Sequence, residues 1–201
     1  MIAIIDYGAG NLFSVKNALD FLEEESIITA DCREIRCADA VILPGVGAFP
    51  DAMHMLREQG LAEVIKEEAQ KKPLLGICLG MQMMFDKSCE NGEYTGLGLM
   101  PGEIVLLPKD QIIPQIGWNR VDWKQSNAVN KGSKSGNYFY FVNSYYVVPD
   151  DDSIVMAVTD YNGEFVSMVS SGNIYASQFH IEKSGTAGLQ LLKNFADLGE
   201  K

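Results

Sequence analysis

Short apolar segments alternate with segments of helical periodicity through the first half of the chain. The apolar runs have the length of buried strands and lie at Ile2–Ile5, Ser26–Ala30, Ala40–Leu43 and Pro73–Cys78. Helical spacing or helix-start residues predict helices that begin after Asn11 and at Pro50, and helices over Leu61–Gln70 and Leu79–Phe85. Strands without a polar face that alternate with helices predict an α/β fold, a doubly wound and mostly parallel sheet flanked by helices.

The second half of the chain has a different pattern. Strand-like segments lie at Tyr138–Val148, Ile154–Asp160, Glu164–Ser170 and Ile174–Phe179, and the pairs Asn162-Gly163 and Gly172-Asn173 between them are typical of hairpin turns. An amphipathic helix is predicted over Thr186–Leu198. No linker rich in Pro, Gly or Ser divides the chain. We therefore expect one domain over residues 1–201, with an antiparallel extension contributed by residues 138–179.

The composition excludes several classes of function. The chain has 201 residues, of which 47% are hydrophobic and 21% charged, and its formal net charge is −11. Such a negative field repels phosphate backbones and no basic patch offsets it, so nucleic acid is not an expected partner. No apolar stretch reaches the ~18–20 residues of a membrane span, and no signal peptide is recognised. The four cysteines include no C-x-x-C pair and fit reduced thiols, which predicts a cytoplasmic protein.

The segment Gly76-Ile77-Cys78-Leu79-Gly80 places a cysteine where a predicted strand passes into a predicted helix. This is the spacing of a nucleophile elbow, with a thiol in place of a hydroxyl. The N–H groups and positive dipole end of the following helix favour the thiolate over the thiol. Taken alone, the motif also fits a buried structural cysteine, which is a common fate of this residue.

A nucleophilic thiol needs a proton-transfer partner, and the chain contains two histidines. His54 lies in a helical stretch without other catalytic residue types and is interpreted as a structural or surface residue. His180 ends the strand-like segment 174–179, and Glu182 follows two residues later. Alternate residues of an extended backbone face the same side, which predicts that Glu182 orients the imidazole of His180. Cys78, His180 and Glu182 all fall at strand ends, where open parallel sheets build their sites.

Acyl transfer at Cys78 also requires donors for an oxyanion. The backbone N–H of Leu79, directly after the nucleophile, is one donor. The second is expected from Val46 in the loop Pro44–Gly47, although this segment fits a plain tight turn equally well. Two distant histidines and no paired cysteines do not supply a zinc site, and Gly8-Ala9-Gly10 lacks the rest of either nucleotide-binding motif. We therefore expect no metal and no cofactor.

Taken together, these residues resemble a class I (triad) glutamine amidotransferase, and within that family the glutaminase subunits of imidazole glycerol phosphate synthases. The resemblance runs nearly end to end and rests on Ile5–Leu12, Pro44–Phe49, Gly76–Gln82, Gly117–Asn119, Ser144–Tyr146 and Gln178–Ser184. The elbow and the F-H-x-E segment are typical of the superfamily. The opening segment, P-G-V-G-A-F and G-W-N are typical of this subunit.

The resemblance implies hydrolysis of glutamine to glutamate and ammonia. Cys78 would form the glutamyl thioester, His180 would transfer protons, and Glu182 would orient His180. The implied substrate contacts are Gln82, Glu90, Ser144 and Tyr145, with the last two acting through their backbone, and the implied oxyanion donors are Val46 and Leu79.

The resemblance also implies a partner subunit. Tyr140 and Lys183 match residues that face a (β/α)8-barrel cyclase, which forms a heterodimer with the glutaminase and uses the ammonia in histidine biosynthesis. The chain departs from the family pattern at Asn143, usually His, and at Ile181, usually Pro, which removes a fixed φ. Three alternatives stay open: a paralogue that supplies another synthase such as a sugar amidotransferase, a stand-alone cysteine hydrolase, and a non-catalytic binding subunit. The intact triad residues argue against the last.

Overall fold

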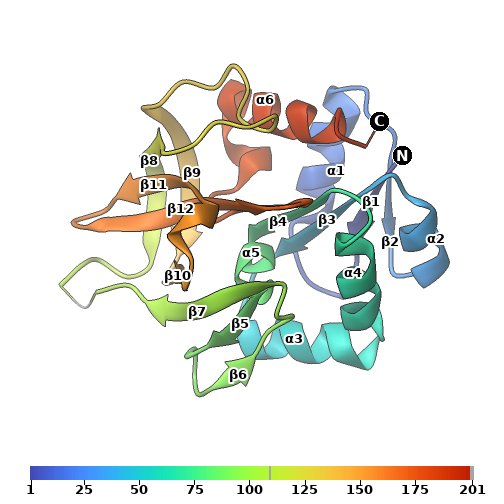
Figure 1. Ribbon diagram of the computed structural model, residues 1–201, viewed down its shortest axis with the longest axis horizontal. Coiled ribbons are helices and arrows are strands. Elements are labelled where there is room, and N and C mark those ends of the chain that lie inside the picture. Colours follow the sequence, from blue (N-terminus) through green and yellow to red (C-terminus); the bar gives the residue numbers. More distant parts are fainter. Residues whose placement is uncertain (109, 200–201) are drawn as a thin grey trace.

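A parallel sheet forms the centre of the structure. In the computed structural model, which describes residues 1–108 and 110–199, parallel strands lie in the order β2–β1–β3–β4–β13 (Figure 1). Their bounds are β1 Ile2–Ile5, β2 Ser26–Thr29, β3 Ala40–Gly45, β4 Leu74–Cys78 and β13 Ile174–Ser177. The predicted doubly wound parallel core is confirmed, and the first four strands begin and end within two residues of the predicted runs.

Helices cover both faces of this sheet (Figure 1). The helices α1 (Leu12–Phe21) and α6 (Gly185–Ala196) pack on one face, against Ile2, Ile4 and neighbouring residues of the same layer. The opposite face, which includes Ala3 and Ile5, packs against α2 (Cys32–Cys37), α3 (Phe49–Glu58), α4 (Leu61–Ala69) and α5 (Leu79–Met83). Successive residues of β1 thus enter different cores, which explains why this strand has no polar face. No helix in the described part of the chain is long and apolar enough to cross a membrane.

The antiparallel part of the sheet continues from β13. There β12 (Glu164–Ser171) pairs with β13, with β11 (Val155–Asp160) and with β10 (Tyr145–Pro149). One branch runs through β7 (Met100–Leu106) to β5 (Phe85–Ser88) and β6 (Tyr94–Thr95), and the other through β8 (Gln115–Trp123) to β9 (Asn137–Asn143). Two short 3-10 helices, η1 (Asp152–Ile154) and η2 (Ile181–Lys183), complete the elements. The second branch brings β9 next to the end of β13, where His180 follows.

The structure corrects several predicted elements. The segment 138–148 is two strands rather than one, because the chain leaves β9 at Ser144 and enters β10, and the Ser144 carbonyl accepts from Leu107 N–H instead. This second part of the sheet also begins much earlier than residue 138, with β5 to β8, and it is not wholly antiparallel, because β5 runs parallel to β7. The predicted helix 79–85 ends at Met83, and Phe85 already belongs to β5. The short helix α2 was not predicted; Asp31 begins it by accepting a hydrogen bond from Arg33 N–H (2.7 Å).

Candidate active site

Cys78 lies at the junction of β4 and α5 with a backbone conformation that L-residues avoid. Its φ is 56° and its ψ is −111°, and such a strained residue persists only where the surroundings hold it. The flanking glycines allow this close packing. A Cβ on Gly80 would lie 1.8 Å from the Leu43 carbonyl oxygen, and one on Gly76 would lie 2.9 Å from the Met81 nitrogen. The predicted elbow is therefore present, and it rests tightly on the end of β3.

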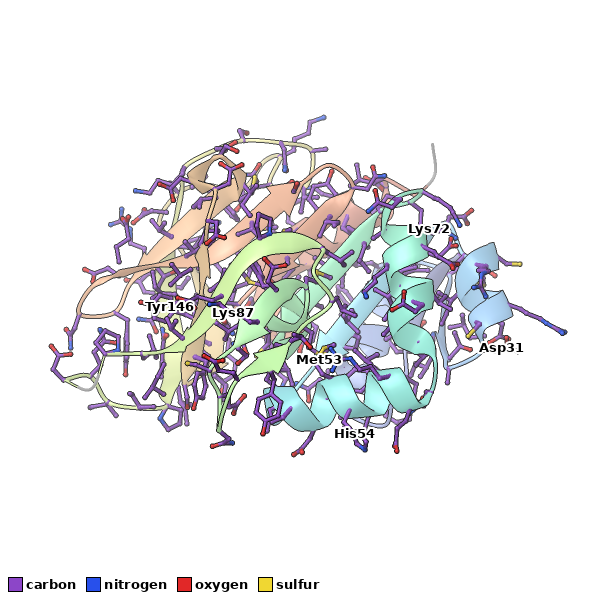
Figure 2. The ribbon with its side chains drawn as sticks, turned by 60° about the horizontal axis from the view of Figure 1, so that its bottom comes forward. Asp31, Met53, His54, Lys72, Lys87 and Tyr146 are labelled. Carbon is purple, nitrogen blue, oxygen red and sulfur yellow. The ribbon has the colours of Figure 1, made fainter. Side chains whose placement is uncertain are left out.

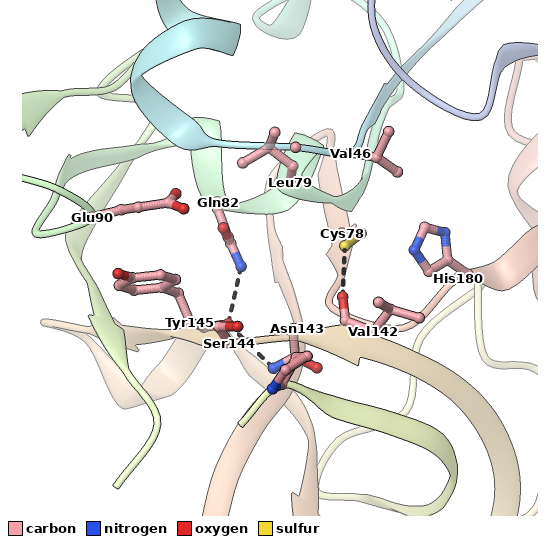
Figure 3. A pocket seen from close by; sticks show the side chains of 12 residues that line it. Val46, Cys78, Leu79, Gln82, Glu90, Val142, Asn143, Ser144, Tyr145 and His180 are labelled. Carbon is pink, nitrogen blue, oxygen red and sulfur yellow. Dashed lines mark hydrogen bonds between the residues drawn. The ribbon is translucent and has the colours of Figure 1, made fainter. Parts of the chain in front are cut away.

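His180 lies beside this cysteine (Figure 3) and forms a buried pair with Glu182. Nδ1 of His180 lies 2.8 Å from Oε1 of Glu182, and the two side chains are almost completely inaccessible to solvent. The predicted contact is present, but the predicted reason for it is wrong: β13 ends at Ser177, and Glu182 lies in the 3-10 helix η2. The tight turn, rather than alternation along a strand, brings the carboxylate back to the ring.

Ser184 anchors this turn to the neighbouring strand β9. Its hydroxyl donates to the His180 carbonyl (2.6 Å) and accepts from Tyr140 N–H (3.0 Å). The His180 N–H in turn donates to the Tyr140 carbonyl (2.9 Å). His180 itself is extended, and Ile181, which replaces the usual proline, is fully buried. The serine and the apolar packing of Ile181 therefore hold the turn without a fixed proline φ.

The charge state of His180 follows from its two polar neighbours. Burial by itself lowers the pKa of His180, but hydrogen bonds and charge interactions with Cys78 and Glu182 outweigh burial and raise the pKa to about 10. The imidazole is therefore protonated at neutral pH. Because Glu182 occupies Nδ1, the Nε2–H is the proton that remains for the sulfur and for a substrate.

A cavity of about 210 Å³ opens in front of Cys78 (Figure 3). It is smaller than the roughly 300–1,000 Å³ of pockets for drug-sized ligands, which suits a substrate of amino-acid size. The cavity is lined by Val46, Gly47, Cys78, Leu79, Gln82, Glu90, Pro114, Val142, Asn143, Ser144, Tyr145 and His180. Every sequence-predicted nucleophile, oxyanion and substrate residue lies on its wall, together with His180.

Two candidate substrate residues already have structural partners. Oε2 of Glu90 accepts from the Phe49 N–H (2.8 Å) at the start of α3, which ties this carboxylate to the helix that follows the loop at Val46. Nε2 of Gln82 donates to the Tyr145 carbonyl (3.0 Å), and Nδ2 of Asn143 donates to the same carbonyl (3.2 Å). The departure at Asn143 thus keeps a hydrogen bond that fixes the turn between β9 and β10.

The two predicted oxyanion donors approach the cavity from different elements. Leu79 is the first residue of α5, so its N–H is not used within the helix. Val46 directly follows β3, is partly exposed, and precedes Gly47, whose φ of 104° is open to glycine alone. The peptide at Val46 therefore lies just outside β3, in an exposed turn whose conformation depends on Gly47.

Other predicted residues lie outside the cavity. His54 is exposed on α3 (Figure 2), where its Nε2 lies 3.3 Å from Oε1 of Glu58, and it does not line the cavity. Lys183, the last residue of η2, is exposed. The ring of Tyr140 packs between Trp118 and His180, with ring centroids 5.9 and 6.5 Å away. Sequence reasoning gave no role to Gln178, which is fully buried and contacts the sulfur of Cys78. Its position in the sequence, two residues before His180, was the feature from which a place in the site could have been predicted.

Comparisons with known proteins agree with this geometry. The family model "Glutamine amidotransferase class-I" matches residues 3–198. The "Imidazole glycerol phosphate synthase subunit HisH" of Caldanaerobacter subterraneus subsp. tengcongensis is 49% identical over 199 residues, covering 98% of both chains. The protein of the same name from Aquifex aeolicus is 49% identical over 200 residues, covering 98% of this chain and 97% of its own. A crystal structure described as a glutamine amidotransferase matches with a TM-score of 0.79 at 18% identity over 100% of both chains, which supports the fold.

Proposed function

The chain belongs to the class-I glutamine amidotransferase family, and from this premise we propose how it works as the glutaminase subunit of an imidazole glycerol phosphate synthase. It is an enzyme of histidine biosynthesis that hydrolyses glutamine to glutamate and ammonia. One observation carries the proposed mechanism: Cys78, in its strained elbow, faces a cavity into which His180 is oriented by a buried carboxylate. The proposal treats residues 1–201 as a single amidotransferase domain.

The first half-reaction forms a thioester. The reaction begins with Cys78 as a thiolate beside protonated His180. The thiolate attacks the side-chain amide carbon of glutamine, so that a C–S bond forms and the carbonyl electron pair moves to oxygen. The N–H groups of Leu79 and Val46 donate hydrogen bonds to this oxyanion, as donors of this kind do in acyl transfer. His180 then gives its proton to the amide nitrogen, the C–N bond breaks, and ammonia leaves.

The second half-reaction returns the enzyme to its starting state. Neutral His180 takes a proton from water as the water oxygen attacks the thioester carbon. The C–S bond breaks, Cys78 leaves as a thiolate, and the imidazolium remains paired with Glu182. Glutamine and water are thereby converted to glutamate and ammonia, with no cofactor in the balance.

Charge and geometry favour an amino-acid substrate. Glu90 keeps one carboxylate oxygen on Phe49 N–H and offers the other to an α-ammonium group. At the other wall, we assign the backbone N–H groups at Ser144 and Tyr145 to the substrate carboxylate, with Gln82 beside them. The Tyr145 carbonyl itself is occupied by Gln82 and Asn143, so this carbonyl is a structural acceptor and not a substrate contact.

The relatives named above are subunits of a synthase, and we propose that the partner here is a (β/α)8-barrel cyclase that forms a heterodimer with this chain. The outer face of β8 and β9 supports this. Ile116, Trp118 and Tyr138 on that face are 63%, 53% and 59% exposed, and exposed apolar clusters of this kind mark interaction sites. The face adjoins the cavity, because Val142 belongs to both. We assign Tyr140 and Lys183 to the same interface and place the complex in the cytoplasm.

Acid quenching during turnover tests the mechanism directly. The chain is mixed with its cyclase partner and glutamine, quenched with acid, digested, and analysed by mass spectrometry. We expect a glutamyl group on the peptide that contains Cys78, and no such group on the peptides of Cys32, Cys37 or Cys89. A turning-over complex with the adduct on another residue would contradict the mechanism.

A further inference from the structure

A line of buried side-chain amides connects the nucleophile to the turn that follows β9. Nε2 of Gln178 lies 3.7 Å from Sγ of Cys78, and Oε1 of Gln178 accepts from Nε2 of Gln82 (3.0 Å). Gln82 also donates to the Tyr145 carbonyl (3.0 Å). The mechanism above uses Cys78, Gln82 and the backbone at Tyr145, but it leaves Gln178 without a role.

The direction of these hydrogen bonds is set by the backbone. A carbonyl oxygen can only accept, so the Gln82 atom next to Tyr145 O is the NH₂ group. The second hydrogen of that group points to Gln178, whose nearest atom is therefore its oxygen. The NH₂ group of Gln178 must then face Cys78. The orientation of both amides follows from a fixed acceptor and needs no choice between flipped forms.

This donor matters most when the sulfur is ionised. In the thiol form, Cys78 can donate to the Val142 carbonyl, 3.7 Å away. The thiolate has no hydrogen for that carbonyl, and two electron-rich atoms then face each other. Gln178 still donates to the sulfur in this state, and a hydrogen bond to the charged form favours ionisation. Gln178 thus offsets the repulsion that arises when Cys78 loses its proton.

The position of Gln178 is fixed by burial and by a backbone hydrogen bond. It is fully buried, and its backbone N–H donates to the Ser167 carbonyl (2.9 Å) on β12. It therefore links the position of the sulfur to that of Gln82 on α5.

We propose that Gln178 is a positioning residue of the glutaminase reaction, which orients the Cys78 thiolate through its NH₂ group and holds the substrate-facing Gln82 through its oxygen. This inference rests on the proposed function for its consequence in turnover. The state of the sulfur, however, can be measured without glutamine.

The test compares Gln178→Met and Gln178→Glu with Ser167→Ala in the full-length chain. Met keeps the volume but has no NH₂ donor, and Glu is isosteric but presents an acceptor. Ser167→Ala is a matched control, because its buried hydroxyl has no hydrogen-bond partner among the described residues. Alkylation of Cys78 by iodoacetamide is followed by mass spectrometry from pH 5 to 10, with the exposed Cys37 as an internal reference.

We expect both Gln178 variants to lower the alkylation rate at neutral pH by about 10- to 100-fold, the effect of losing a hydrogen bond to a charged group. The midpoint of the pH profile should move up by roughly 1–2 units. In Gln178→Met, inactivation by a glutamine-mimicking electrophile should also require a higher concentration, because Gln82 loses its hydrogen-bond acceptor, whereas the Glu carboxylate can still accept from Gln82. Ser167→Ala should match the wild type in all three measurements.

A folded Gln178→Met with the wild-type pH profile would overturn the inference, and Gln178→Glu decides the matter if the Met variant does not fold. Failure of the proposed function gives a different result. In that case the glutamine mimic does not inactivate the wild-type chain. The pH dependence of Cys78 alkylation by iodoacetamide still shows whether Gln178 acts on the sulfur.

Discussion

Among the four cysteines of this chain, the one at the active site is the least accessible. Cys78 is only 7% exposed, whereas Cys37 and Cys89 are exposed. The cysteine that is most accessible to solvent is therefore not the one that we expect to react with the substrate. The proposed nucleophile is the thiol that has a protonated imidazole beside it and helix N–H groups behind it.

Replacement of Cys78 by Ala or Ser should lower glutamine hydrolysis by several orders of magnitude, as loss of the nucleophile does in other catalytic triads. A glutamine-mimicking electrophile should label Cys78 first, because only this thiol has the cavity in front of it. Peptide mapping of the labelled chain checks this result. Even labelling of all four cysteines would argue against the assignment.

The charge of His180 gives a pH prediction. Its pKa in the folded chain, about 10, lies above the ~6.5 of an unfolded histidine. The stability that comes from this pairing is therefore fully present below about pH 6.5 and is lost as the pH rises through about 10. Two-dimensional NMR of the ring nitrogens should show His180 protonated at pH 8, with His54→Ala used to assign the signals.

Replacement of Glu182 by Gln removes a charged acceptor from this pair. The apparent pKa of His180 should fall toward neutral values, and glutaminase activity should fall less than in His180→Ala, because Gln can still accept from Nδ1. His54→Ala should keep near-wild-type activity, since His54 is exposed on α3. An essential His54 would show that the site is wrongly assigned.

At the scale of elements, the chain shows which local features sequence patterns can reveal. β1 to β4 are buried on both faces and were predicted closely, since continuous apolar runs allow few alternatives. β8 has mostly half-exposed or exposed residues, and its apolar residues face a surface, so it gave no periodic signal. Ser144 ends β9 through a single backbone bond to Leu107, which no residue pattern records.

The elbow depends on close packing at Gly80. Gly80→Ala would place a methyl group 1.8 Å from the Leu43 carbonyl oxygen, a backbone atom that cannot rotate away. We expect a loss of about 1–3 kcal/mol or more, measured by denaturant unfolding. Gly172→Ala serves as a comparison, because its Cβ would meet no atom within 4 Å and only the backbone strain of about 1–2 kcal/mol applies. Equal losses in the two variants would contradict the packing argument.

The turn η2 offers a second test at this scale. Ile181→Pro should fold and keep activity, because His180 before it is extended and Pro is favoured at the first position of a helical turn. Ser184→Ala should cost about 1–3 kcal/mol in unfolding free energy, since it leaves Tyr140 N–H without its partner. Its glutaminase activity should also fall as His180 loses its anchor. If Ile181→Pro lost more stability and activity than Ser184→Ala, the turn would not be held by Ser184 as described.

At the scale of the whole molecule, the active site and the exposed apolar face are continuous. Cys78 contacts the Val142 carbonyl and His180 N–H donates to Tyr140 O, so both proposed catalytic residues touch β9, whose outer face is exposed. The residues at the site were predicted from motifs, but this continuity was not, because it depends on the pairing of β8 with β9. A partner bound to that face would contact β9, the strand that touches Cys78 and His180.

Lys183→Glu should weaken the association with the proposed cyclase partner or the effect of that partner on activity, while alkylation of Cys78 stays as in the wild type, because Lys183 does not line the cavity. Trp118→Lys should act in the same direction, since it places a charge in the centre of the apolar face. Binding measured by calorimetry and alkylation measured in parallel separate these effects. A lower Cys78 alkylation rate in either variant would place that residue in the site instead.

The central claim is that this chain is a glutaminase subunit whose activity depends on its partner. The most direct measurement is steady-state ammonia release by the isolated chain, by its complex with the proposed cyclase partner, and by that complex with a cyclase ligand bound. An oxyanion donor at Val46 that is held out of position in the isolated chain forfeits roughly 3–4 kcal/mol, or a factor of about 10²–10³ in rate. The account predicts slow release by the chain alone and an increase of this size in the liganded complex. Full-rate hydrolysis by the isolated chain would contradict it and favour a stand-alone hydrolase.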